Sequence, residues 1–147
     1  MSELTVPSRK LTHDGVRKLI DAAVAAADEM GVPMGIAVAN DGARVVGYLL
    51  MDGARVLAME SASAKAMTAA NHRMPTHAIP YDVGIGLSIS TQGKVIPLKG
   101  GVPIVLDGHC VGGIGCGSGT GEQDLVVAKA ALAAIGAEIP DDDVTEG

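Results

Sequence analysis

Two lysines and two histidines are the side chains of this sequence whose types and positions best suit chemistry. Lys65 lies in an alanine-rich stretch, and Lys99 stands directly before the double glycine Gly100-Gly101. A lysine in a cleft can hold a carboxylate or an oxyanion, and glycine backbone lets a ligand approach closely. His72 and His77 lie near the expected end of a helix, where a histidine can move a proton or ligate a haem iron.

These residues define a predicted site. The catalytic candidates are Lys99, Lys65 and His72, and the ligand-binding candidates are His77, Arg73, Asn71, Thr68, Gly100 and Gly101. His72 and His77 are metal ligands only if a haem iron is bound, because the sequence has no C-x2-C or H-E-x-x-H zinc spacing. Structural interpretations stay open beside these roles: a solvated surface lysine, a histidine that suits a helix C-terminus, and a polar stripe that is the wet face of a helix (Ser61, Lys65 and Thr68).

A glycine-rich segment, Gly115–Gly121, precedes the last expected helix. Free backbone amides at a helix N-terminus can bind an anion, but the segment lacks the GK[ST] ending of a P-loop. Its glycines alternate and do not match the G-x-G-x-x-G fingerprint of dinucleotide-binding proteins. The segment therefore indicates either an anion site or a tight, closely packed connection between a strand and a helix.

Composition excludes several classes of protein. The chain has 147 residues, which predicts one domain, and a formal net charge of −6 with two tyrosines as its aromatic residues. Nucleic-acid binding is not expected, because it needs a basic patch and usually stacking aromatics. No membrane span or signal peptide is expected, so we predict a cytoplasmic protein. Cys110 and Cys116 lie too far apart on one expected strand to form a disulfide.

The pattern of apolar residues and turns predicts an α+β fold with a largely antiparallel sheet. Helices are expected over 12–30, 54–73 and 121–135, the last with a capping box of Thr120 and Gln123. Asp-Gly turns predict hairpins between strands 34–39 and 44–51 and between strands 102–106 and 110–116. Short strands are expected over 87–90 and 94–98, after an irregular connection over 74–86. Residues 1–10 are predicted to be a flexible arm, 11–137 a single domain and 138–147 an acidic tail.

The order of these motifs resembles a known family. The segments are LTHDGVRKLIDAAVAAADEMGVP, IAVANDGARVVGYLLMDGA, SAKAMTAA and KGGVPIVLDGHCVGGIGCGSGTGEQD. They resemble the small GlcG-like, HbpS-type haem-binding domains, which also occur as the C-terminal domain of some corrinoid adenosyltransferases. The resemblance implies a profilin-like sandwich with about five strands, a homo-oligomer, and a place in small-molecule catabolism. The chain departs from the family at Lys99, where members often have proline, and in the two histidines of Asn71–Pro80.

Two functions follow. The first is binding of a small ligand, with haem or a related tetrapyrrole as the named candidate, His72 or His77 as its axial ligand, and propionate partners among Lys65, Lys99 and Arg73. The alternative is a cofactor-independent isomerase, lyase or hydrolase of a small organic acid or carbonyl compound in a catabolic or biosynthetic pathway, with a lysine and a histidine in the pocket. An accessory protein without chemistry is a third interpretation. The pocket is expected between the end of the second helix and the loop 99–103.

Overall fold

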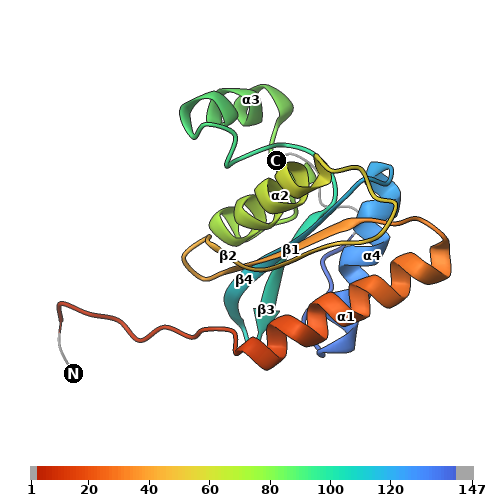
Figure 1. Cartoon of the computed structure of the whole chain (residues 1–147). Coiled ribbons are helices and arrows are strands. Elements are labelled where there is room, and N and C mark those ends of the chain that lie inside the picture. Colours follow the sequence, from red (N-terminus) through yellow and green to blue (C-terminus); the bar gives the residue numbers. More distant parts are fainter. Residues whose placement is uncertain (1–2, 142–147) are drawn as a thin grey trace.

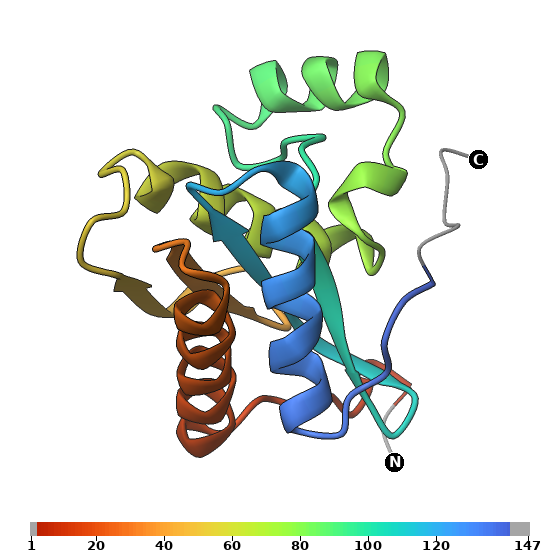
Figure 2. The ribbon, with the colours of Figure 1, turned by 90° about the vertical axis from the view of Figure 1, so that its right-hand side faces the viewer.

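One antiparallel sheet with helices on both faces organises the chain. The structure, a computed structural model, describes residues 3–141. Its elements are α1 (His13–Met30), β1 (Gly35–Asn40), β2 (Val45–Leu50), α2 (Ala58–His72), the 3-10 turn η1 (Thr76–Ala78), α3 (Tyr81–Ser90), β3 (Gly101–Leu106), β4 (His109–Gly117) and α4 (Gly121–Ala134). The strands pair in the order β2-β1-β4-β3. Helix α2 covers one face, and α1 and α4 cover the other (Figures 1 and 2).

Alternation along β1 separates the two faces. Ile36 and Val38 are fully buried in the larger core, which they share with residues of α1 and α4. Ala37 and Ala39 point to the opposite face and pack with alanines of α2. Because successive strand residues face opposite sides, one strand supplies large side chains to one layer and small ones to the other. The predicted α+β class with a packed antiparallel sheet is therefore confirmed.

Small residues bring α2 unusually close to the sheet. A Cβ atom built on Gly113 would lie 2.4 Å from the Ala66 carbonyl oxygen, and one on Gly115 would lie 2.3 Å from that of Ala62. Both positions belong to β4, so part of the glycine-rich segment is strand and not loop. The alternating glycines thus serve close packing of a helix on a strand, which was one of the two interpretations of this pattern.

Local signals placed the ends of several elements correctly. Helix α1 begins after Thr12, whose side chain accepts a hydrogen bond from the Gly15 amide, and ends at Gly31 in the left-handed conformation. Helix α4 begins with the predicted capping box, in which Thr120 and Gln123 satisfy each other's backbone amides. The β3–β4 turn has positive φ at both Asp107 and Gly108, as a two-residue hairpin turn of type I′ requires. Helix α2 starts later than predicted, because the chain before it forms turns and the Arg55 amide bonds to Ser118 Oγ.

The expected strands over 87–90 and 94–98 are wrong, and the sheet has four strands instead of about five. Residues 87–90 are the last turn of α3, a helix that the sequence pattern did not predict because its apolar run contains Gly84 and Gly86. Residues 94–98 lie beside α2 without a strand partner. Their amides bond to threonine side chains instead: Val95 N to Thr91 Oγ1, and Ile96 N to Thr68 Oγ1. The profilin-like description stays a prediction.

The boundaries of the domain stay a prediction as well. Residues 5–12 have no regular structure, although ion pairs join Arg9 to Asp107 and Lys10 to Asp41. The predicted acidic tail lies partly outside the described residues, which end at Asp141. Within the described chain, no helix has the length and apolar character needed to cross a membrane.

Candidate functional site

The predicted catalytic residue Lys65 is buried in an ion pair. Its ammonium group donates hydrogen bonds to Asp124 Oδ2 at 2.9 Å and to the Cys116 carbonyl oxygen at 2.8 Å. The other carboxylate oxygen of Asp124 accepts a hydrogen bond from the Gly119 amide. Burial raises the pKa of Asp124, although Lys65 and the Gly119 amide oppose this shift. The pair therefore joins α2, the end of β4 and the start of α4.

The double glycine closes tightly over this pair. Gly100 has φ +127°, and a Cβ atom there would lie 2.8 Å from both Lys65 Nζ and Asp124 Cβ. A Cβ on Gly101 would lie 2.6 Å from the Lys65 carbonyl oxygen. The glycines thus make room for groups of this chain. Beside the loop 99–103, where a pocket was predicted, Lys65 and Asp124 lie directly against Gly100 and Gly101.

Lys99 lies outside this cluster. Its ammonium group forms an ion pair with Glu122 on the first turn of α4, and its side chain is one-third exposed. A carboxylate near a helix N-terminus is favourable in itself, so the pair has a structural role at the start of α4. Lys99 and Lys65 therefore have different ion-pair partners, and their shared role in one binding site stays a prediction.

The other nominated residues cluster around the C-terminal end of α2. Thr68 is fully buried, and its hydroxyl donates to the Ala64 carbonyl oxygen and accepts from the Ile96 amide. His72 Nδ1 lies 3.3 Å from the Thr68 carbonyl oxygen and 3.3 Å from the side-chain nitrogen of Asn71. Arg73 ends the helix in the left-handed conformation, and His77 belongs to η1. Of these residues, Thr68 and His72 have side chains that contact backbone groups at this end of the molecule.

Arg73, one of the nominated residues, lines a pocket. That pocket has a volume of about 310 Å³ and also contains Arg9, His109 and Cys110. Two larger pockets lie at the start of α1 and contain none of the nominated residues. Among residues 3–141, no three histidine, cysteine or acidic side chains come close enough to hold a metal ion.

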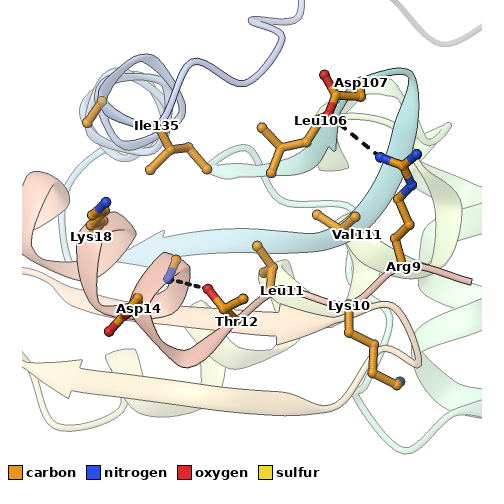
Figure 3. Close-up of a pocket in the computed structure, with 12 residues that line it drawn as sticks. Arg9, Lys10, Leu11, Thr12, Asp14, Lys18, Leu106, Asp107, Val111 and Ile135 are labelled. Atoms are coloured by element: carbon orange, nitrogen blue, oxygen red, sulfur yellow. Dashed lines mark hydrogen bonds and ion pairs between the residues drawn. The ribbon is translucent and has the colours of Figure 1, made fainter.

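The first of these larger pockets has an apolar floor and a charged rim (Figure 3). Its volume is about 500 Å³. Leu11, Leu106, Val111 and Ile135 form the floor, and Arg9, Lys10, Lys18, Asp14 and Asp107 surround it. Arg9 is held by Asp107 at 3.6 Å, and the Lys10 ammonium group bonds to Asp41. Such a pocket suits a small anion with an apolar body.

The second pocket lies between α1 and the edge strand β2, and we call it the α1–β2 groove. Its volume is about 520 Å³, and it shares Lys10 and Leu11 with the first pocket. Val16 and Ile20 of α1 and Val46 of β2 line it, together with His13 and Arg17. Gly47 lets α1 lie close to the strand, since a Cβ there would be 2.4 Å from Val16 Cγ1. The groove therefore combines apolar walls, one imidazole and two cations.

Sequence reasoning passed over His13 because it follows a helix N-cap and is exposed. Its side chain is indeed 84 % exposed, with Asp14 Oδ1 at 3.8 Å as an ionic neighbour. The sequence nevertheless contained a pattern that places His13 beside apolar residues. His13, Val16 and Ile20 follow helical spacing, so the histidine continues the apolar face of α1. The sequence did not show that β2 lies beside that face.

Comparisons with known proteins agree with this architecture. The family model described as "Haem degrading protein HbpS-like" matches residues 11–133. A 15.0 kDa protein in the dhaT-dhaS intergenic region of Citrobacter freundii is 32 % identical over 127 residues, which is 83 % of this chain and 89 % of that protein. The corrinoid adenosyltransferase PduO of the same organism is 33 % identical over 88 % of this chain, but the match spans only 40 % of that enzyme.

Solved structures of related proteins have the same fold as this chain. A PduOC:heme complex superposes with a TM-score of 0.81 at 28 % identity and covers 90 % of this chain and all of that one. A double mutant of HbpS from Streptomyces reticuli has a TM-score of 0.81 at 28 % identity, with 92 % and 93 % coverage. The family match, the relatives and these structures agree over nearly the whole described chain. The chain therefore belongs to the HbpS-like family, to which the C-terminal domain of PduO and GlcG are related.

Proposed function

We propose that this chain binds haem in the α1–β2 groove, with His13 as the axial ligand. The observation that carries the proposal is the position of the His13 imidazole at a groove of about 520 Å³ lined by Val16 and Ile20. Imidazole nitrogen is a common haem ligand, and an apolar wall suits a porphyrin face. Membership in a family whose relatives include a haem complex supports the same ligand.

The donor set of the groove fits the chemical character of haem. The exposed imidazole of His13 is free to turn toward a ligand, and Lys10 and Arg17, which line the same groove, would supply cations for propionate groups. Tyr48 also lines the groove, but its hydroxyl is buried near Gly35 on the side of the sheet that α2 covers, so aromatic stacking is not part of this fit. When bound, haem would supply an iron centre for ligand binding or redox chemistry. The chain itself would provide the axial nitrogen, the apolar wall and the charge.

The predicted ligands His72 and His77 remain competing proposals. His72 Nδ1 lies near the backbone oxygen of Thr68, which leaves its other ring nitrogen to act. Neither residue lies in the α1–β2 groove. A haemin titration of histidine variants therefore decides between the α1–β2 groove and the end of α2.

Haemin titration followed by the visible spectrum tests the proposal. We expect a saturable, shifted Soret band that His13→Ala abolishes or weakens at least about ten-fold, while His72→Ala, His77→Ala and the matched control His109→Ala keep it. His13 is exposed, so its removal should leave the unfolding temperature unchanged. Loss of the band in His72→Ala or His77→Ala alone would move the site to the end of α2. A non-saturable response of the wild-type chain would refute haem binding.

A second candidate function rests on the charged pocket of Figure 3: binding of a small organic anion, as the enzyme alternative requires. Lys18 and Arg9 stand at the rim over an apolar floor, so a carboxylate with a short apolar body fits. Thermal unfolding with and without small carboxylates tests it. A rise in unfolding temperature that Lys18→Ala removes would support the anion site, and no rise with any carboxylate would exclude it. Catalysis by Lys99, Lys65 or His72 stays a prediction.

We further propose that the chain acts as a homo-oligomer, as the resemblance to its family implies, and that it acts in the cytoplasm. Exposed apolar side chains of α3, which lie outside the haem groove, support association with other copies.

A further inference from the structure

A small polar pocket, which we call the Cys110 pocket, lies where four segments of the chain meet. It has a volume of about 310 Å³, and it is lined by the segment 7–9, Asp41, the end of α2 and residues 108–110. Small-molecule pockets range from about 300 to 1,000 Å³, so this one is at the lower end. Pro7 and Ala70 are its apolar side chains. The pocket therefore suits a small polar ligand and offers no apolar wall for a porphyrin.

A β-bulge turns the Cys110 side chain into this pocket. The pairing of β3 with β4 shifts by one residue, so that Val111 is extra on β4. Val111 packs in the larger core together with Ile114, although strict alternation would place residues three apart on opposite faces. The bulge thus puts Val111 on the core face and Cys110 on the side of α2, where it lines the pocket with Ala70. Bulges often re-aim a side chain beside a functional site.

The Cys110 thiol is accessible, and this chain offers it no disulfide partner. Cys110 is partly exposed, and its Sγ donates a weak hydrogen bond of 3.4 Å to the Gly112 carbonyl oxygen. The second of the two cysteines, Cys116, is buried six positions further along the same strand. That separation is too great for a disulfide. Any disulfide at Cys110 must therefore include a sulfur from another molecule.

Basic side chains surround the thiol. Arg9, Arg73 and His109 line the pocket together with one acidic residue, Asp41. The Lys10 ammonium group already neutralises Asp41 at 2.9 Å. Within residues 3–141, no carboxylate forms an ion pair with Arg73. Since a guanidinium group binds a carboxylate through two parallel hydrogen bonds, Arg73 is the residue best placed to hold an acidic ligand.

We propose that the Cys110 pocket binds a small thiol compound that carries carboxylate groups, and that Cys110 forms a mixed disulfide with it. The reaction is thiol–disulfide exchange with the disulfide form of the compound. The Cys110 thiolate attacks one sulfur of that disulfide, and the new S–S bond forms as the old one breaks. The other half leaves as a thiolate and takes up the proton that Cys110 has lost. Arg73 and Arg9 bind the carboxylates while this exchange occurs.

This site is separate from the two proposed above. The Cys110 pocket contains none of the residues that line the α1–β2 groove, and it shares Arg9 with the charged pocket of Figure 3. Its chemistry needs neither haem nor catalysis on a carbonyl compound. Haem binding and mixed-disulfide formation can therefore fail independently of each other.

The charge of the whole chain makes the source of any selectivity recognisable. The formal net charge is −6, so the molecule as a whole repels an anionic disulfide and attracts a cationic one. A preference of Cys110 for the anionic compound must therefore come from the basic residues around the pocket. Local fields of this kind raise association rates by roughly 10- to 1,000-fold, and the effect weakens as salt is added.

Rates of mixed-disulfide formation with the full chain test the proposal. The probes are oxidised glutathione, which carries carboxylates, uncharged bis(2-hydroxyethyl) disulfide and cationic cystamine. Each rate is divided by the rate of the same probe with 2-mercaptoethanol, which removes differences in intrinsic reactivity. At low salt we expect one adduct, at Cys110 by peptide mass mapping, and a normalised rate with oxidised glutathione at least about ten-fold above that with cystamine. Equal rates, the reverse order or an adduct at Cys116 would overturn the site.

Arginine variants show whether the pocket is the cause of this preference. Arg73→Gln should lose most of the preference for oxidised glutathione, whereas Arg73→Lys, which keeps the charge, should retain most of it. Arg55→Gln is the matched control, because Arg55 is an exposed arginine outside this pocket and its loss changes the net charge equally. Cys110→Ser should form no adduct. Arg73 is itself exposed, so urea unfolding should show an intact fold in its variants. A preference that Arg73→Gln keeps, or that Arg55→Gln loses equally, would overturn the role of Arg73.

Discussion

The ammonium group of Lys65 donates a hydrogen bond of 2.9 Å to the Asp124 carboxylate, and both side chains are almost completely buried. Taking both charges out of water costs several kcal/mol per ion, which the pair offsets only through its own attraction and its further hydrogen bonds. The Cys116 carbonyl and the Gly119 amide supply those bonds. Lys65 is therefore a structural connection between α2 and α4 in the described chain.

Removal of one partner should be strongly destabilising. Lys65→Met leaves the Asp124 carboxylate buried without its cation, and we expect a loss of about 3–5 kcal/mol in the free energy of unfolding, measured with urea. The double variant Lys65→Met with Asp124→Asn should recover much of this loss, because the asparagine keeps an acceptor for the Gly119 amide. Lys18→Met, which removes an exposed lysine, is the control. A loss below about 1 kcal/mol for Lys65→Met would contradict a structural role for the pair.

The fold was predictable where the signal is local. The N-cap Thr12, the capping box at Thr120 and the Asp107-Gly108 turn each act within a few residues, so the sequence alone could place them. Helix α3 could not be found in this way, because its stability does not come from a core-facing stripe within this chain. The strand expected over 94–98 is wrong because threonine side chains bond to the amides of Val95 and Ile96. The strand expected over 87–90 is wrong because these residues end α3.

The site was harder to predict than the fold. A lysine in an alanine-rich helix suggests a wet face, and only the tertiary position of Asp124, far along the chain, shows that Lys65 is buried. The double glycine suggested access for a ligand, whereas Gly100 makes room for Lys65 and Asp124. The α1–β2 groove forms only when two separate elements pack together, so His13 had no partner in the sequence. Long-range packing therefore decided which polar residues face a pocket.

The close approach of α2 to β4 predicts sensitivity to a single methyl group. Gly115→Ala would place a Cβ atom 2.3 Å from the Ala62 carbonyl oxygen, so the helix must move away from the sheet. We expect a loss of about 1–3 kcal/mol in urea unfolding. Gly42→Ala is the control, because its nearest atom lies at 3.4 Å and its φ is not positive. Equal stability of the two variants would mean that α2 is not packed as closely as described.

The two cysteines should differ sharply in reactivity. Cys116 is fully buried, and burial together with the charge of Asp124 raises the pKa of its thiol, whereas Cys110 is partly exposed. Since the thiolate is the reactive form, a thiol reagent should modify one cysteine rapidly in the native chain and the second only after unfolding. Cys110→Ser should remove the rapid phase, and Cys116→Ser should leave it unchanged. Two rapid thiols in the native protein would contradict the burial of Cys116.

The ion pair between Lys10 and Asp41 predicts the direction in which the pKa of Asp41 changes when Lys10 is removed. The hydrogen bond from Lys10, at 2.9 Å, is the main cause that holds the pKa of Asp41 below its ordinary value of 3.8. A carboxyl group with a lowered pKa in the folded state stabilises the fold above pH 3.8, and this contribution disappears as the pH falls through the folded value. Lys10→Met should therefore raise the pKa of Asp41, as followed by the carboxyl carbon signal in NMR, and the stability difference from wild type should vanish in acid. Lys18→Met is the control, and an Asp41 titration that is the same in wild type and Lys10→Met would show that the pair does not persist in solution.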